Sequence, residues 1–509
     1  MRLNILIGGK AGQGINKVSE IVSQTLVNQG YFTFNYRDYP SIIMGGHNHN
    51  VLSVSNKPIA SHESKIDIIM ALDELTKKIH ANETKKNSIT IDYKPFIKFG
   101  INLNIALSGA LTKVLGIPEL VLLEQVKKSL RKKAHHKEAI KAAKGGYNSQ
   151  TSNYNLKRLN NKLSMMNGSK ATAIGAINSK MDLYIAYPMT PATGVLHELA
   201  AKQLEKDFMV FQPEGEIAAV NMALGASFSG AKTMIGTSGG GFDLMSEGLS
   251  LQGSSEIPLV VYLASRVGPG TGIPTYNMQG DLDIALRAGH GEFPRIVASP
   301  GDPLETIEIT NQLMYLSEKH RCLSILLSDK HIAESEFSTN RKPSKPLKIK
   351  IERKLPHEQI IKSSSYDQDN HGLTTEAAEF AINNANARIK KYNQIKKTTS
   401  QLPMTKLHGK KQSKNLVIGW GSTKGAILDA IKDEDFKFLQ IIYLKPLSDK
   451  IKQEIQNAKK TILVESNITG QLGRLIREKT GISIKNRILK YDGRPFRSDE
   501  LKKQLLEIK

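Results

Sequence analysis

Cysteine is almost absent from this sequence, and so are long apolar runs. The only cysteine, Cys322, cannot form a disulfide within the chain, and one thiolate is too few to bind an iron–sulfur cluster. Any redox centre that this protein uses is therefore expected on another chain. No apolar run is long enough to span a membrane, and Met1-Arg2-Leu3-Asn4 leads into an expected strand instead of a signal peptide. We expect a cytoplasmic protein.

Two common phosphate-binding signatures are incomplete. The glycine-rich residues 8–14 lie between an apolar run and a helix-like run, but Lys and Ser/Thr do not follow, which excludes a Walker A loop. A dinucleotide fingerprint needs an acidic residue at a strand end about 20 positions later, and Asp38 comes too late. Backbone N–H groups at a helix start attract anions, so Gly9, Gly12 and Gly14 either bind a phosphate or form a tight structural turn.

Positive charge is in excess. The net charge is +23, and its densest stretch is residues 127–137. Such a stretch can attract nucleic acid, acidic proteins or phosphorylated ligands. No zinc-ligand spacing, RNA-recognition signature or alternation of aromatic and basic residues accompanies it. A solvated helix face is the simpler interpretation, and a basic nucleic-acid-binding protein is the alternative from another functional class.

The chain is too long for one core and divides into four expected segments. Residues 1–150 alternate strand-like and helix-like runs, which predicts an α/β domain with a parallel sheet. A Gly/Asn/Ser-rich linker is expected near residues 145–161. The expected strands and one helix of this first domain are residues 3–7, 32–36, 50–55, 67–72 and 88–92, with the helix at 16–29.

Residues 165–333 predict a second α/β domain with a doubly wound parallel sheet. Residues 334–415 are polar and predict a connector with one helix near residues 374–391. Residues 416–509 predict a smaller α/β domain with strands at 416–418, 438–443 and 461–464. The six strands expected in the second domain are residues 183–186, 209–212, 232–236, 259–264, 295–298 and 322–327.

Three polar residues follow expected strands of the second domain. Thr190 is either a helix cap or part of a ligand site at the carboxyl end of a strand. Glu216 begins a helix of small residues, where it either complements the helix dipole or serves in acid–base catalysis. Arg266 either forms a surface ion pair or holds a carboxylate in a bidentate manner. Because the carboxyl ends of parallel strands share one edge, a single pocket could collect all three.

Seven segments in a fixed order resemble a known family. They are Tyr187-Pro188-Met189-Thr190-Pro191, Glu214-Gly215-Glu216-Ile217-Ala218, Gly268-Pro269-Gly270-Thr271-Gly272-Ile273-Pro274-Thr275, Gln279-Gly280-Asp281-Leu282, Gly289-His290-Gly291-Glu292-Phe293-Pro294-Arg295, Glu465-Ser466-Asn467-Ile468-Thr469-Gly470-Gln471-Leu472 and Lys490-Tyr491-Asp492-Gly493-Arg494-Pro495-Phe496. Together they resemble the alpha subunit of 2-oxoacid:ferredoxin oxidoreductases. Residues 1 to about 150 resemble the gamma subunit of the same enzymes, fused ahead of alpha.

The resemblance implies thiamine diphosphate chemistry in a pyrimidine-type domain, with a transketolase C-terminal-like domain at residues 416–509. In this family a glutamate at the position of Glu216 holds the aminopyrimidine ring in the tautomer that takes the proton from the thiazolium carbon. Thr190 and Arg266 match the family's substrate-binding positions. Tyr187 and Pro188 match positions beside the cofactor. The glycine loop that contains Gly9, Gly12 and Gly14 is expected near coenzyme A.

A beta subunit is expected to supply the rest of the site. A Gly-Asp-Gly…Asn magnesium motif is missing, because Pro303 follows Gly301-Asp302 and no glycine precedes Asp492-Gly493. We therefore expect magnesium, the diphosphate-binding half and the iron–sulfur cluster on that subunit, and no metal site on this chain. The resemblance implies a (gamma-alpha/beta)2 heterotetramer that passes electrons to ferredoxin, without membrane or nucleic-acid partners.

One segment departs from the family pattern. Gamma domains commonly carry Arg-Gly-Gly after Tyr-Pro-Ser, whereas this chain reads Tyr39-Pro40-Ser41-Ile42-Ile43-Met44-Gly45-Gly46-His47-Asn48. The loss of the arginine weakens the case for a phosphate grip in this loop. The expected reaction is CoA-dependent oxidative decarboxylation of a 2-oxoacid, with pyruvate and 2-oxoglutarate both open. An indolepyruvate-type or sulfopyruvate-like thiamine enzyme is the alternative within the fold.

Overall fold

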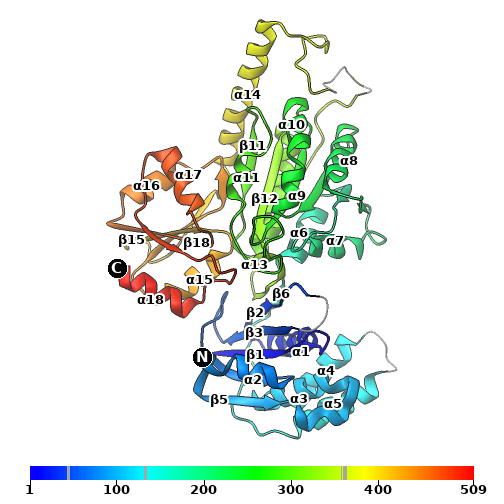
Figure 1. The fold of residues 1–509 in the computed structure, drawn as a ribbon, viewed down its shortest axis with the longest axis vertical. Helices are drawn as coiled ribbons and strands as arrows, with labels where there is room; N and C mark the ends of the chain where they lie inside the picture. Colours follow the sequence, from blue (N-terminus) through cyan, green and yellow to red (C-terminus); the bar gives the residue numbers. More distant parts are fainter. Residues whose placement is uncertain (43–45, 131–134, 357, 359–363, 509) are drawn as a thin grey trace. The chain divides into compact units, whose positions relative to one another are not determined.

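The computed structural model describes residues 1–42, 46–130, 135–356, 358 and 364–508, so part of the basic stretch at 127–137 lies outside the described residues. The chain forms two compact units (Figure 1). Unit 1 comprises residues 1–166, 335–341 and 497–503. Unit 2 comprises residues 167–334, 342–496 and 504–509. Within the described residues, no helix is both long enough and apolar enough to cross a membrane.

Unit 1 is built on a seven-stranded sheet with the order β5-β4-β1-β3-β2-β13-β6. Its strands are β1 (Arg2–Lys10), β2 (Phe32–Asp38), β3 (His47–Ser55), β4 (Ile66–Ala71), β5 (Thr84–Asp92), β6 (Ser164–Met166) and β13 (Glu336–Thr339). Its helices are α1 (Ile15–Asn28), α2 (Glu74–Ile79), α3 (Leu103–Val114), α4 (Glu119–Ser129), α5 (His136–Tyr147) and the start of α18 (Ser498–Ile508), with 3-10 turns η1 (Ala81–Glu83) and η2 (Lys94–Asn102).

The expectation of a parallel sheet in this unit is wrong for more than half of the strands. In the part of this unit that the structure describes, only β1, β4 and β5 pair in parallel, whereas β1–β3, β2–β3, β2–β13 and β6–β13 are antiparallel. The connection between β2 and β3 spans only residues 39–46. A parallel crossover needs a dozen residues or more, so a connection of this length dictates antiparallel pairing.

The stretch expected to be a linker is bound to the core of unit 1. Residues 148–163 contain no helix or strand, but the Tyr154 amide donates to the Val114 carbonyl at 3.0 Å and the Leu159 amide donates to the Gln29 carbonyl at 2.8 Å. Leu156 is buried against the helices of this unit. The composition of this stretch reflects an irregular but packed backbone.

The larger sheet of unit 2 confirms all six strands expected in residues 165–333. Its order is β17-β11-β12-β10-β9-β7-β8, and the six run in parallel. The strands are β7 (Leu183–Ile185), β8 (Met209–Phe211), β9 (Thr233–Thr237), β10 (Leu259–Ser265), β11 (Arg295–Ala298), β12 (Leu323–Asp329) and the antiparallel β17 (Tyr443–Lys445). The helices of this region are α6 (Gly168–Asn178), α7 (Thr193–Ala200), α8 (Glu216–Phe228), α9 (Gly239–Leu244), α10 (Ser246–Ser255), α11 (Leu282–Arg287), α12 (Pro303–His320) and α13 (Lys330–Glu334).

A five-stranded sheet completes unit 2, with the order β14-β16-β15-β18-β19. The three expected strands are present, and β14 and β19 were not expected. The strands are β14 (Thr405–Gly409), β15 (Asn415–Trp420), β16 (Lys437–Ile441), β18 (Lys460–Glu465) and β19 (Asn486–Leu489). The helices are α14 (Ala378–Thr399), α15 (Thr423–Ala430), α16 (Lys450–Gln456), α17 (Gln471–Thr480) and the end of α18. The helix expected near 374–391 is α14, which begins later and runs eight residues further.

Candidate active site

The three predicted site residues each follow a strand of the larger sheet. Thr190 lies in the loop after β7, Glu216 begins α8 after β8, and Arg266 directly follows β10. Within the sheet these strands occur in the order β10-β9-β7-β8. The sequence-based placement of the three residues at the carboxyl ends of strands in one sheet is therefore confirmed, at the edge where parallel α/β sheets bind ligands.

Arg266 and Thr190 are in direct contact. The Arg266 Nη1 group donates a hydrogen bond to the Thr190 backbone carbonyl at 2.9 Å. A guanidinium has five N–H donors, so Arg266 can hold this carbonyl and still grip a carboxylate. Burial lowers the pKa of Arg266 and the nearby Asp281 carboxylate opposes that shift. The guanidinium is half-buried, unlike the partners of a typical surface ion pair.

The loop that presents Thr190 also carries Tyr187 and Pro188. Tyr187 is 38% exposed and Pro188 is partly buried, so the loop presents an aromatic ring at the surface. Tyr187, Pro188 and Thr190 thus share the loop after β7 that Arg266 contacts through the Thr190 carbonyl.

Glu216 is a buried carboxylate with an unpaired oxygen. Its side chain is 5% exposed, and its Oε1 atom has no hydrogen-bond partner among the described residues. The residue that caps α8 is Gly215, without a side-chain cap hydrogen bond. Leaving a buried carboxylate oxygen unpaired costs free energy, which folding accepts mainly where the group serves a ligand or a reaction.

A glycine on α9 makes room for this carboxylate. A Cβ added at Gly241 would come within 2.5 Å of Glu216 Oε1 and would also collide with Thr237 Oγ1. At the neighbouring Gly240 an added Cβ would meet open space. Packing beside Glu216 thus requires a glycine at position 241 but not at position 240, and this role of Gly241 could not be predicted from the run of three glycines.

Asp281 is a further acidic group near Arg266. The sequence analysis named it only as part of the family-like segment Gln279-Gly280-Asp281-Leu282. A Cβ added at Gly239 would come within 2.8 Å of the Asp281 Oδ1 atom. Burial raises the pKa of Asp281 to about 6, Ser265 and Arg266 lower it, and Asp243 raises it. Carboxyls tuned toward neutral pH are concentrated at functional sites.

Two of the family-like segments, those that begin at Gln279 and at Glu465, are hydrogen-bonded to each other. Gln279 accepts a hydrogen bond from the Ser466 amide at 2.9 Å and donates to the Trp420 carbonyl at 2.8 Å. Asn467 donates to the Gln279 carbonyl at 3.1 Å, and the buried Glu465 accepts from Trp420 Nε1 at 3.1 Å. These hydrogen bonds link the segment at Gln279 to the ends of β15 and β18.

The glycine loop of unit 1 is a left-handed turn that its own side chain partly closes. Gly12 has φ +89° and Gly14, which caps α1, has φ +85°, so both positions favour glycine. The Gln13 side chain accepts a hydrogen bond from the Lys10 amide at 2.7 Å, and a Cβ added at Gly9 would collide with that side chain. An added Cβ at Gly12 would meet open space.

Comparisons with known proteins point to one group of enzymes. Residues 174–403 match the family model described as pyruvate flavodoxin/ferredoxin oxidoreductase, thiamine diphosphate-binding, and residues 4–149 match the model described as pyruvate ferredoxin/flavodoxin oxidoreductase. A 2-oxoacid:ferredoxin oxidoreductase subunit alpha from Saccharolobus solfataricus is 30% identical over 612 aligned positions, covering 99% of this chain and 97% of the relative. The subunit of the same name from a Sulfolobus species is 29% identical over 613 positions, covering 100% and 97%.

One solved structure shares the fold over nearly the entire chain. It is the 2-oxoglutarate:ferredoxin oxidoreductase from Magnetococcus marinus with 2-oxoglutarate, coenzyme A and succinyl-CoA bound. The TM-score is 0.87, the sequence identity is 23%, and the match covers 99% of each chain.

Proposed function

The chain belongs to the family of 2-oxoacid:ferredoxin oxidoreductase alpha subunits, and from this premise we propose that it is the gamma-alpha chain of such an enzyme. The reaction is CoA-dependent oxidative decarboxylation of a 2-oxoacid to acyl-CoA and CO2, with electrons passed to ferredoxin. The observation that carries the proposal is the unpaired, buried Oε1 atom of Glu216 at the carboxyl edge of the parallel sheet.

The surroundings of Glu216 fit thiamine diphosphate. Its orphaned carboxylate oxygen is an acceptor for a protonated ring nitrogen, and Gly241 leaves that oxygen uncovered by a side chain. When bound, thiamine diphosphate supplies the carbon nucleophile that cleaves a 2-oxoacid next to its carbonyl. Glu216 would hold the aminopyrimidine ring and keep a proton on its ring nitrogen, and Tyr187 and Pro188 would flank the cofactor.

The contact between Arg266 and Thr190 supports a substrate-binding role for both. A 2-oxoacid carries a carboxylate, and a guanidinium anchored by a backbone carbonyl is a rigid bidentate partner for it. We assign the substrate carboxylate to Arg266, with Thr190 on the same side.

Exposed apolar side chains near Glu216 support a beta subunit that covers the site. Phe211 on the edge strand β8 is 44% exposed, Ile217 on α8 is 59% exposed, and Leu244 on α9 is 54% exposed. Large apolar side chains gathered on one surface mark interaction sites. We propose that the beta subunit docks here, brings magnesium, the diphosphate-binding half and the iron–sulfur cluster, and assembles as (gamma-alpha/beta)2 in the cytoplasm.

Coenzyme A is proposed to bind at the glycine loop of unit 1. A Cβ added at Gly12 would meet open space, which leaves room for a phosphate group of coenzyme A. The backbone N–H groups at the start of α1 can donate hydrogen bonds to that phosphate.

A substrate panel tests the proposed reaction. The chain is coexpressed with a beta-subunit gene of the same organism, and reduction of a viologen dye is followed with pyruvate, 2-oxoglutarate and indolepyruvate, each with and without coenzyme A. We expect dye reduction with an aliphatic 2-oxoacid only when coenzyme A is present. Activity with indolepyruvate but with neither pyruvate nor 2-oxoglutarate would favour the indolepyruvate-type enzyme. No activity with any 2-oxoacid would contradict the proposal.

A further inference from the structure

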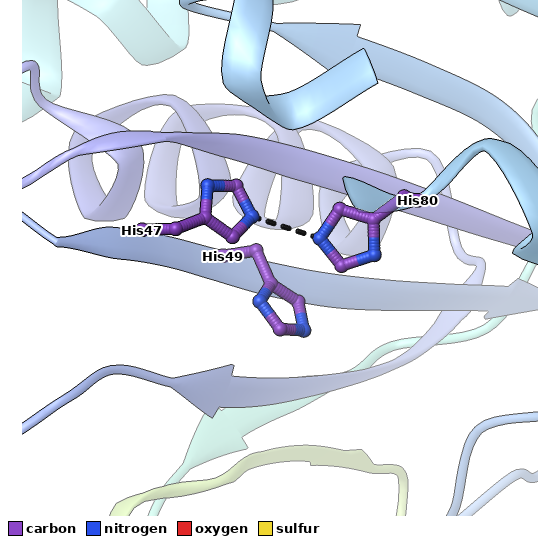
Figure 2. A group of neighbouring side chains, drawn as sticks. All are labelled: His47, His49 and His80. Atoms are coloured by element: carbon purple, nitrogen blue, oxygen red, sulfur yellow. Dashed lines mark hydrogen bonds between the residues drawn. The ribbon is translucent and has the colours of Figure 1, made fainter. Parts of the chain in front are cut away.

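Three histidines of unit 1 lie close together, and two of them, His47 and His49, pair with the end of β1 that leads into the glycine loop. Figure 2 shows the rings of His47, His49 and His80 close to one another, and one ring nitrogen of each lies within 4.8 Å of the other two. The Nε2 atoms of His47 and His80 are 2.8 Å apart. The rings of His49 and His80 have centroids 4.6 Å apart. His80 is buried, and the other two are partly buried.

The fold explains this meeting. His47 and His49 are two residues apart on β3, so their side chains leave the same face of the strand. His80 caps the carboxyl end of α2. The start of that helix is fixed by Asp73, whose Oδ1 atom accepts a hydrogen bond from the Thr76 amide at 2.9 Å. Two separately anchored elements therefore present three imidazoles to one point, and a His-x-His pair on a strand is the sequence signal that was overlooked.

A carboxylate orients one of the three rings. His80 Nδ1 lies 2.5 Å from Glu83 Oε2, and Glu83 Oε1 accepts a hydrogen bond from Arg497 Nη2 at 2.8 Å. A carboxylate on Nδ1 holds the proton there and leaves the Nε2 lone pair directed at the other two histidines. Histidines that bind metals are typically oriented in this way by a carboxylate on the opposite nitrogen.

Several carboxylates lie close to the three histidines. The carboxylates of Asp38 and Asp73 are near enough to interact with His47, and those of Asp38 and Glu83 are near enough to interact with His49. The Nδ1 atoms of His47 and His49 are also buried without a hydrogen-bond partner among the described residues.

We propose that His47, His49 and His80 bind a divalent transition metal, for which Zn2+ is the best fit. Three imidazole nitrogens with a fourth position open to water make a tetrahedral site, at metal–nitrogen distances of about 2.0–2.1 Å. This geometry separates the ligand nitrogens by roughly 3.4 Å. On metal binding, the Nε2 atoms of His47 and His80 would therefore move slightly apart, and each would bind the ion in place of their mutual hydrogen bond. Magnesium is not the expected ion, because it prefers oxygen ligands. The site is independent of the proposed function.

Cobalt titration of the untagged full chain tests the site directly. The protein is first stripped with a chelator, and Co2+ is added while visible absorption is recorded. We expect one equivalent to bind with the intense d–d bands of tetrahedral coordination, and we expect Zn2+ to displace it. His47→Gln and His49→Gln should each weaken binding at least 100-fold. Glu83→Gln, which keeps all three ligands, should weaken it by about 10–100-fold.

His197→Gln is the matched control, because His197 is an exposed histidine on α7 of unit 2. This variant should bind Co2+ like the parent protein. Circular dichroism of every metal-free variant shows whether it is folded, and Glu83→Gln keeps the test decisive if a ligand variant does not fold. A spectrum without tetrahedral bands, or equal affinity in the parent and His49→Gln, would overturn the proposal and leave a hydrogen-bonded histidine cluster.

Discussion

At the scale of single residues, the position of the Glu216 carboxylate depends on the absence of a side chain at one glycine of α9. A side chain at Gly241 would occupy the space beside Glu216 Oε1, whereas a side chain at Gly240 would not touch the site. Both glycines belong to the same short helix, so they form a matched pair of positions that differ in their distance from the carboxylate.

We predict that Gly241→Ala lowers the turnover of the coexpressed enzyme at least tenfold, because the added methyl group displaces Glu216. Gly240→Ala should retain turnover within about twofold, since it fills open space and alanine favours helix formation. Initial rates of viologen reduction with saturating substrate measure both. Equal activity of the two variants would show that the position of Glu216 is not critical.

Asp281 yields a pH-dependent prediction. Its pKa is raised from 3.8 to about 6 chiefly by burial, so between these values the folded protein binds more protons than the unfolded one. The contribution of Asp281 to the free energy of unfolding is therefore fully present below pH 3.8, and it is lost as the pH rises through 6. Asp281→Asn should raise the free energy of unfolding at pH 7.5 by up to about 3 kcal/mol, with little effect near pH 4.

Urea denaturation of the parent protein and Asp281→Asn at both pH values measures this difference. A variant that is less stable than the parent protein at pH 7.5 would mean that the ionised carboxylate is favoured by its neighbours, contrary to the account.

At the scale of secondary-structure elements, a buried ion cluster joins α12 to the five-stranded sheet. Lys424 Nζ lies 2.5 Å from Asp302 Oδ2 and 2.6 Å from Glu305 Oε1, and Lys406 Nζ lies 2.9 Å from the same Glu305 oxygen. Burial alone would raise the pKa of Glu305, but the two lysines outweigh burial and hold it at about 2.

We predict that Lys424→Met destabilises the protein by about 3–5 kcal/mol, because it leaves buried carboxylates without their closest cation. The control is Lys396→Met, which removes an exposed ion pair with Asp449 and should cost less than about 1 kcal/mol. Urea denaturation at pH 7 compares the two. Similar midpoints for both variants would contradict a stabilising role for the cluster.

The glycine loop gives a prediction for coenzyme A. The positive φ of Gly12 makes most substitutions strained, but asparagine tolerates this conformation and its side chain would enter the open space. Gly12→Asn should therefore raise the Michaelis constant for coenzyme A severalfold while the Michaelis constant for the 2-oxoacid stays unchanged. An unchanged constant for coenzyme A would reduce the loop to a structural turn.

Elements with strong local patterns could be predicted from the sequence, whereas short paired ones could not. The six parallel strands of the larger sheet are apolar runs bounded by helices, and all were predicted. By contrast, β13 and β14 lie in a polar stretch, and their strand conformation comes from pairing with β2 and β16. The placement of Arg266 and Thr190 at one edge of the sheet was predicted from the sequence, but their hydrogen bond was not. The fit of Gly241 against Glu216 likewise depends on packing that no local pattern encodes.

At the scale of the whole molecule, the chain joins two units with different contributions. Unit 2 holds Glu216, Thr190 and Arg266 at one sheet edge, and unit 1 holds the glycine loop and the three histidines. Membership of the 2-oxoacid:ferredoxin oxidoreductase family favours an enzyme over a nucleic-acid-binding protein. The high net charge then needs no role in nucleic-acid binding.

The most direct test of the central claim is the activity of a Glu216→Gln variant purified with the beta subunit. The amide keeps the size of the side chain but loses the charge that would hold a protonated ring nitrogen. We predict a loss of 2-oxoacid-dependent viologen reduction of at least about 100-fold, with thermal unfolding unchanged. Full activity in this variant would contradict the role assigned to Glu216.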